Sequence, residues 1–361
     1  MVDLLLEKLP GVAAFSGMSP SALFVIAVML VAAPIFGFIA VNALVAVYAE
    51  RKVSAFMQDR LGPMGQGPGL HAGKWGLLQT VADAIKLLIK EDIIPASADR
   101  KVFILAPYIL FVGVFITFVA LPFNQVLVAA NFNVGAFYIV AMSSIGVIGI
   151  ILAGYSSNNK WSLYGAMRSA AQIISYEIPV GLSLLTVIML VGSLKMQDII
   201  IAQGGTIWGI LPNWFIFNNP FTFLAFFIFF ISGVAEVNRT PFDLPEAESE
   251  LVAGFHTEYS GMRWSFFFLA EYANMFVVGA MSSILFLGGW QSPINGFMDG
   301  TGWGLFWFMS KTAFLIFVMM WFRWTFPRLR TDQLMRMCWK YFLPFAFVNI
   351  VGVGLWDLLL K

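Results

Sequence analysis

Six of the chain's twenty acidic residues fall within one stretch, positions 236–263. They are Glu236, Asp243, Glu246, Glu248, Glu250 and Glu258. The stretch lies between two of the most apolar runs of the sequence, and carboxylates beside a membrane span are costly unless they are hydrated, paired or protonated. Desolvated acids titrate closer to neutral pH than free ones, so they can exchange protons. We therefore expect this acidic stretch to carry the chemistry of the protein.

A local structural role also fits three of these acids. Asp243 followed by Pro245 and Glu246 is typical of the first turn of a helix, where acids interact favourably with the helix dipole. Asp243, Glu246 and Glu250 would then share one face of that helix. This interpretation does not account for the other acids of the stretch, so it leaves the chemical role open.

Three further ionisable residues lie inside apolar runs. Counted from the nearest basic loop residue, Glu177 and Glu271 lie roughly 12–13 Å deep and Lys311 roughly 18 Å deep, at 1.5 Å per helical residue. Each buried charge costs about 2.5–3.5 kcal/mol on insertion. The alternatives are a relay that holds and releases protons and a simple interhelical pair, for example Glu271 with Lys311. The matched depths favour the relay.

The composition predicts an all-α integral membrane protein. Of the 361 residues, 60% are hydrophobic and only 11% are charged, and the mean hydropathy is +0.83. Apolar runs of about 20 residues that recur along a chain mark a multi-span membrane protein. The net charge of +1 gives no reason to expect a nucleic-acid partner.

The few cysteines and histidines argue against a metal redox centre on this chain. Cys338 is the only cysteine, so it can form no internal disulfide, and the common cysteine-based clusters need about four ligands. The two histidines, His71 and His256, are expected in loops. The N-terminus has no basic region followed by a small-residue cleavage site, so the first span is expected to direct membrane insertion.

Hydropathy predicts eight transmembrane helices within a single membrane domain, 1–361. Their expected ranges are 20–48, 102–122, 136–155, 171–193, 221–237, 264–289, 303–322 and 339–358. Seventeen of the 21 lysines and arginines lie in or at the edge of loops 1–2, 3–4, 5–6 and 7–8; the others are Lys8, Lys195, Lys311 and Lys361. The positive-inside rule therefore places those four loops in the cytoplasm and both termini in the periplasm.

A short amphipathic segment follows the glycine-rich part of the first loop. From residue 75 to 90, leucine, valine, isoleucine and alanine occupy one helical face, and Gln79, Asp83, Lys86 and Lys90 occupy the other. The segment is too short and too charged to span a membrane. We expect an interfacial helix, and a helix packed on a partner protein is the alternative.

Nine motifs together resemble the H subunit family of bacterial NADH–quinone oxidoreductase, respiratory complex I, whose mitochondrial counterpart is subunit 1. The resemblance covers essentially the whole chain in order. It departs from the usual pattern at Trp324, where the family has a small residue, and in its longer glycine-rich stretch. The motifs are Ala-Glu-Arg-Lys-Val (49–53), Leu-Gly-Pro (61–63), Gly-Leu-Leu-Gln-x-x-Ala-Asp-Ala-Ile-Lys (76–86), Ile-Ser-Tyr-Glu (174–177), Glu-x-Asn-Arg-x-Pro-Phe-Asp-Leu-Pro-Glu-x-Glu-Ser-Glu (236–250), Glu-Tyr-Ser-Gly-Met (258–262), Ala-Glu-Tyr (270–272), Pro-Arg-Leu-Arg-Thr-Asp-Gln-Leu-Met (327–335) and Trp-Lys-x-Phe-Leu-Pro (339–344).

The resemblance implies a fold and a set of roles. The fold would be eight spans plus an interfacial helix, placed in the bacterial inner membrane beneath a hydrophilic arm whose subunits carry FMN and iron–sulfur clusters. This chain would bind no cofactor of its own. Quinone would reach its site between the first span, the interfacial helix and the sixth span, beside Arg51, Lys52, Arg60 and Asp83. The residues implied in proton coupling are Glu177, Glu236, Asp243, Glu246, Glu248, Glu250, Glu258, Glu271, Lys311 and Arg323.

The expected function is thus that of a membrane component of a proton-translocating NADH:quinone oxidoreductase. Its expected partners are the other membrane-arm and hydrophilic-arm subunits, quinone and phospholipid. The quinone can be ubiquinone or menaquinone. The alternatives are the related component of a membrane-bound hydrogenase, a stand-alone proton or cation transporter, and a purely structural anchor. A transporter should show an inverted repeat, and the sequence shows none.

Overall fold

The computed structural model describes residues 20–64, 75–207, 211–245, 248–294 and 296–360, and helices dominate them. The expected all-α fold is confirmed. The eight long apolar helices are α2 (Pro20–Met57), α4 (Arg100–Ala120), α5 (Gly135–Ser156), α6 (Lys160–Val191), α9 (Pro220–Glu236), α11 (Gly261–Phe286), α12 (Thr301–Thr325) and α14 (Leu343–Leu360).

Shorter elements connect these helices. The helical ones are α3 (Gln79–Ile89), α7 (Met196–Ala202), α8 (Phe215–Asn218), α10 (Glu248–Leu251), the 3-10 helix η2 (Gly254–His256), α13 (Thr331–Arg336) and the π-helix η3 (Met337–Phe342). Strands β1 (Thr206–Ile207) and β2 (Leu211–Pro212) form a two-stranded antiparallel ribbon. Helices α13, η3 and α14 follow one another without a break.

Each predicted span coincides with one of the apolar helices. Seven helices, or runs of consecutive helices, are long and apolar enough to cross a membrane, and α9 is the short eighth with 17 residues. Some helices extend beyond the predicted ranges, because hydropathy detects the apolar part of a helix and local capping decides where it ends. Helix α6 begins at Lys160, where the Asn159 side chain accepts a hydrogen bond from the Trp161 amide at 2.9 Å.

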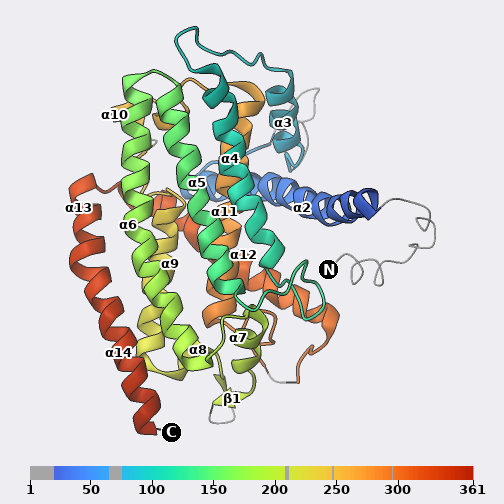
Figure 1. Ribbon diagram of the computed structural model, residues 1–361, viewed down its shortest axis with the longest axis vertical. Coiled ribbons are helices and arrows are strands. Elements are labelled where there is room, and N and C mark those ends of the chain that lie inside the picture. The colour runs from blue at the N-terminus through green and yellow to red at the C-terminus, as the bar shows by residue number, and fades with distance from the viewer. Residues whose placement is uncertain (1–19, 65–74, 208–210, 246–247, 295, 361) are drawn as a thin grey trace.

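Most of the helices run roughly along the long axis of the molecule, and α2 runs across it (Figure 1). Only 11% of the most apolar stretch of α2 is buried within the chain. Side chains in the N-terminal half of the helix are therefore available to contact lipid or another protein. The opposite end of α2 enters the bundle and packs on α3, α4, α11 and α12. Helix α2 therefore connects the outside of the bundle with its interior.

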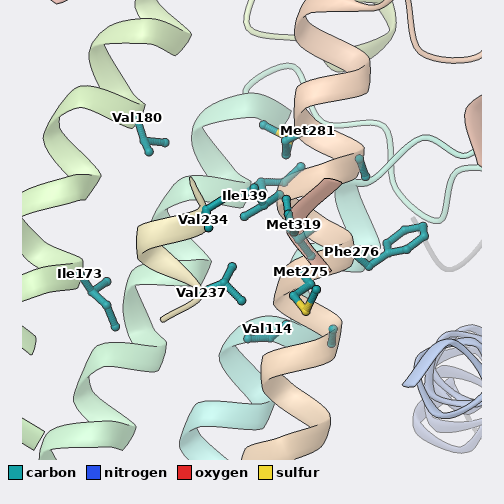
Figure 2. Close-up of a cluster of buried hydrophobic side chains, with 14 of the residues drawn as sticks. Val114, Ile139, Ile173, Val180, Val234, Val237, Met275, Phe276, Met281 and Met319 are labelled. Carbon is teal, nitrogen blue, oxygen red and sulfur yellow. The ribbon is translucent and has the colours of Figure 1, made fainter. Parts of the chain in front are cut away.

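The core lies between α4, α5, α6, α9 and α11. Figure 2 shows Val234 and Val237 at the end of α9 between Ile173 and Val180 of α6 on one side and Met275 of α11 on the other. Helices α4 and α5 approach closely because Gly149 has no side chain: a Cβ there would lie 2.7 Å from the Leu110 nitrogen. These contacts fix the end of α9, where the acidic stretch begins.

Candidate functional site

A buried cluster of charges lies where four elements meet. Glu50 comes from α2, Arg239 from the loop after α9, Glu271 from α11 and Arg323 from α12. Arg239 Nη1 donates to both Glu50 oxygens at 3.1 and 3.2 Å, and its Nε lies 2.8 Å from Glu271 Oε1. Arg323 Nη1 donates to Glu50 Oε1 at 2.5 Å. Tyr272 adds its hydroxyl, which donates to Glu50 Oε2 at 2.7 Å.

Burial makes this charge cluster energetically important. Glu50 is 6% exposed and Arg239 is 2% exposed. Burial alone would lower the pKa of Arg239, but Glu271, Tyr272 and Glu50 raise the pKa of its guanidinium well above its usual range. Arg239 is therefore a permanent cation between two carboxylates. A buried ion pair is stable only when each charge keeps its partner and its hydrogen bonds.

The loop that carries Arg239 is held by α6. Gln172 Nε2 donates to the Ala235 and Phe242 carbonyls at 2.7 Å each and to Asn238 Oδ1 at 3.1 Å. Asn238 adopts a positive φ of 55°, a conformation that asparagine tolerates better than most residues. The chain therefore reverses directly after α9, and the reversal aims the Arg239 side chain back into the bundle.

A cavity of about 110 Å³ lies beside the charge cluster, between α4, α5, α6 and α11. Two of the predicted acids, Glu236 and Glu271, line it together. His256, Asn238, Asn274 and Ser143 also line it, and the other lining side chains are largely apolar. A buried water needs roughly 10–15 Å³ of cavity volume, so this cavity has room for several waters. Its polar side chains can form hydrogen bonds with them.

Glu177 is not among the residues that line this cavity, but it lies close enough to Glu236 for their charges to interact. The Glu236 carboxyl interacts with Ser143 of α5 and with the charge of Glu177, and the Glu177 carboxyl interacts with Ser144. Glu177, Glu236 and Glu271 thus form a series that runs from α6 past the end of α9 to α11. The structure brings together acids that are up to 94 positions apart in the sequence.

Three other acids of the loop interact with α6, its N-cap or the segment before α13. Asp243 accepts from Arg328 Nη2 at 3.0 Å, Glu250 pairs with Arg168 at 2.5 Å, and Glu258 Oε1 accepts from Asn159 Nδ2 at 2.6 Å. The hydrogen bond and the charge of Arg168 lower the pKa of Glu250. Glu246 lies outside the described residues. Glu248 begins α10, and its side chain is also outside the described part.

The predicted helix start at Asp243 is wrong. Leu244, which follows it, is not helical, and α10 is described only from Glu248. Asp243 instead pairs with Arg328. Its carboxylate is therefore stabilised by the charge of that side chain and not by a helix dipole. The predicted shared face of Asp243, Glu246 and Glu250 therefore does not form on one helix.

The residues expected near the quinone lie where α2 meets α3. Arg51 Nη1 donates to Asp83 Oδ2 at 2.5 Å, which joins the end of α2 to α3. Lys52 Nζ donates to the Leu61 carbonyl at 3.0 Å, and Arg60 is exposed in the same turn. Helices α2, α3 and α11 all contact one another. The ion pair between Arg51 and Asp83 therefore lies one residue along α2 from Glu50 of the charge cluster.

Lys311 does not pair with Glu271, so the alternative of an interhelical ion pair between them is wrong. Its ammonium donates to the carbonyls of Leu287, Gly289 and Gln291 at 2.6, 3.0 and 2.7 Å. These carbonyls follow the C-terminal end of α11, where the helix dipole favours a cation. The ammonium also lies 4.1 Å from the Trp214 ring centre. Lys311 therefore joins α12 to the end of α11.

Replacing Lys311 with methionine should destabilise the fold by about 2–4 kcal/mol, because the carbonyls after α11 lose charge-assisted hydrogen bonds and stay buried. The measurement is the thermal unfolding midpoint of the purified complex in detergent. Lys195→Met is the matched control, since Lys195 lies near the surface and 3.9 Å from Asp198. Equal midpoints for the two variants would contradict the capping role of Lys311.

Within the described ranges, no group of three or more histidine, cysteine, aspartate or glutamate side chains could hold a metal ion. Cys338 is buried, and its thiol donates to the Ser175 carbonyl at 3.0 Å. The charged side chains of the site therefore contact one another and the backbone.

Sequence reasoning missed the centre of the charge cluster. Glu50 and Arg239 lie inside the motifs 49–53 and 236–250, but neither is among the predicted site residues. Glu50, like Glu236, stands at the end of an apolar run. This position could have identified it as a candidate site residue. Gln172 and Tyr272 carry no such signal, because polar groups on helices are common and their partners lie far away in the sequence.

The chain matches known proteins over nearly its whole length. Residues 26–354 match the family model described as NADH dehydrogenase. The chain is 52% identical to the H subunit of NADH-quinone oxidoreductase from Chlorobium luteolum over 352 residues, which cover 95% of this chain and 92% of the relative. It is 54% identical to the protein of that name from Chlorobaculum tepidum, with 92% and 93% covered. A Geobacillus protein of the same name is 52% identical, with 86% and 87% covered. The chain therefore belongs to the NADH dehydrogenase family, among the H subunits of NADH-quinone oxidoreductase.

Proposed function

We propose that this protein forms the membrane access route for quinone and couples quinone reduction to proton translocation. The observation that carries the proposal is the continuity between the two regions. Arg51 and Asp83 join α2 to α3, Glu50 is the neighbour of Arg51 on α2, and Arg239 links Glu50 to Glu271 on the cavity. A change of charge at the α2–α3 junction therefore occurs one residue away from Glu50, and the ion pairs of Arg239 connect Glu50 with Glu271 on the cavity.

The α2–α3 junction is suited to an amphipathic ligand. Arg51 supplies a cation and hydrogen-bond donors for a polar head group, and Lys52, Arg60 and Asp83 lie in the same region. Leu61, Leu77, Leu88 and Ile89 are exposed large apolar side chains nearby on the first loop and α3. Apolar surface of this kind suits an isoprenoid tail that arrives from lipid.

Coupling would work through electrostatics. Reduction of a quinone takes up two protons, and the change in local charge acts on carboxylates in a site of low dielectric, where charge–charge energies reach several kcal/mol. Asp243, Glu246, Glu248, Glu250 and Glu258 would respond on the loop, and Arg323 would supply counter-charge. Glu271, Glu236 and Glu177 would pass the proton change across the bundle as coupled titrating groups.

The orientation in the membrane and the partner subunits that we propose are taken from the family. The end of the bundle with α3 and α10 would face the cytoplasm of a bacterium and the hydrophilic arm, and both termini would lie on the periplasmic side of the inner membrane. Electrons would come from FMN and iron–sulfur clusters on partner subunits, because this chain would hold no redox centre. Ubiquinone and menaquinone both fit this proposal.

Glu271→Gln tests the proposal in the assembled complex reconstituted into liposomes. Glutamine keeps the shape of the side chain but cannot ionise, so quinone reduction and proton pumping should both fall about 100-fold or more, within the range that proton-transfer groups contribute. The measurements are NADH:quinone reductase rate and acidification of the liposome interior. Glu91→Gln, at an exposed acid beyond α3, is the matched control. Unchanged rates and pumping in both Glu271→Gln and Glu246→Gln would refute the proposal.

A further inference from the structure

His256 lines the same cavity as Glu236 and Glu271. It ends the 3-10 helix η2, which follows the acidic loop, and its ring meets the Trp264 ring edge-on at 6.2 Å between centres. Two contacts fix η2 on α6. Ser162 Oγ donates to the Phe255 carbonyl at 2.9 Å. Gly165 of α6 has no side chain, and this lets the Gly254 backbone approach: a Cβ on residue 165 would lie only 2.8 Å from the Gly254 Cα. The position of His256 is therefore set by backbone packing.

The cavity connects His256 with the two acids. Trp264, Phe268, Glu271 and Asn274 recur at helical spacing along the cavity side of α11. Trp264, next to His256, is seven residues before Glu271, which corresponds to roughly 10 Å along the helix. A cavity with room for several waters can bridge a separation of that size.

Burial keeps His256 neutral, although two acids share its cavity. Burial lowers the pKa of His256 to about 4, well below its ordinary value. The ionisable groups that share the cavity with it are Glu236, at the end of α9, and Glu271 of α11. Helices α4, α5 and α6 contribute only uncharged side chains to the lining. A neutral imidazole has one N–H donor and one nitrogen acceptor, so it can accept a proton on one side and release one on the other.

We propose that His256 passes protons between the acidic loop and the waters of the cavity, and so to Glu236 and Glu271. One ring nitrogen accepts a proton as the other releases its own proton to a cavity water, and rotation of the ring then turns the new N–H toward the cavity again. No electron moves, and no other reactant is consumed. The inference rests on the proposed function. It makes His256 the residue that connects the buried acids Glu236 and Glu271 with the loop.

The test uses His256→Gln and His256→Ala in the whole complex in liposomes. Glutamine keeps hydrogen bonds but cannot exchange a proton in this way, so quinone reduction and pumping should fall about tenfold or more. Thr257→Val is the matched control, since it removes the hydrogen bond from Thr257 Oγ1 to Gly254 O within the same turn and leaves the imidazole. That control should keep its rates within twofold. The amount of intact complex recovered from the membrane checks the assembly of each variant.

Rescue separates proton transfer from packing. Imidazole added to His256→Ala should restore turnover at least fivefold, whereas pyrazole, of the same size but a much weaker base, should not. Equal rescue by both compounds, or full activity of His256→Gln, would overturn the inference. If Glu271→Gln lowers turnover and His256→Gln does not, the relay through His256 is wrong and the proposed function stands. If Glu271→Gln, Glu246→Gln and His256→Gln all leave turnover and pumping unchanged, the proposed function itself fails.

Discussion

Replacing Arg239 with methionine should destabilise the folded chain by about 3–5 kcal/mol, the cost of leaving buried charge unpaired. Arg239 contacts Glu50 and Glu271 at once and is almost completely buried, so its loss leaves two carboxylates without their shared cation. Methionine fills a comparable volume, which separates the loss of charge from the loss of packing. The expected result is a marked fall in the thermal midpoint and in the amount of assembled complex.

Arg100→Met is the control for that experiment. Arg100 is exposed at the first residue of α4, and exposed charges contribute about 0–1 kcal/mol. Arg239→Lys is an informative second variant, because lysine keeps the charge but cannot present two donors in the fixed geometry of a guanidinium. An Arg239→Met complex as stable as the Arg100→Met complex would show that the charge cluster does not hold the bundle together.

Replacing Glu50 with glutamine should have an effect of similar size, about 3–5 kcal/mol. Glu50 lies between Arg239 and Arg323 and accepts the Tyr272 hydroxyl, so glutamine leaves two cations close together without the anion between them. Glu50 is also the contact of α2 with the cluster, so its loss should loosen α2 in particular. Proteolysis and hydrogen exchange of the α2 region measure that directly.

The double variant shows whether Glu50 and Arg239 act together. Groups in one network do not contribute additively, so Glu50→Gln combined with Arg239→Met should cost clearly less than the sum of the single changes. Glu91→Gln combined with Arg100→Met, two exposed positions, should be additive. Additivity in the buried pair would mean that each residue stabilises the fold through other contacts.

The helices could be predicted from the sequence, but the way they come together could not. Long apolar runs have only one stable form in lipid, because the backbone must satisfy its own hydrogen bonds there. Each predicted span therefore falls on a helix. The charge cluster depends on partners such as Glu50 and Tyr272, 222 positions apart. No local pattern encodes such a pairing.

The roles predicted for the acids stay predictions, but their placement can be compared with the structure. Counting residues along a helix gives depth, and Glu177 and Glu271, with matched expected depths, lie in one series with Glu236. Counting gives no rotation about the helix axis and no partner. That is why Arg239 was missed as the partner of Glu271, and why the carbonyls that hold Lys311 were missed as well.

The short length of α9 has a consequence for energy conversion. Its 17 residues span about 26 Å, against about 30 Å for the hydrocarbon core, and α9 lies beside only the lower half of α6 (Figure 1). In the orientation proposed above, the loop after it would lie below the cytoplasmic lipid surface and take Glu236 with it. An elementary charge that crosses a membrane exchanges about 2.3 kcal/mol with each 100 mV of voltage. A proton that reached Glu236 from the cytoplasm would then have crossed a fraction of that voltage, so an energised membrane would resist its uptake directly.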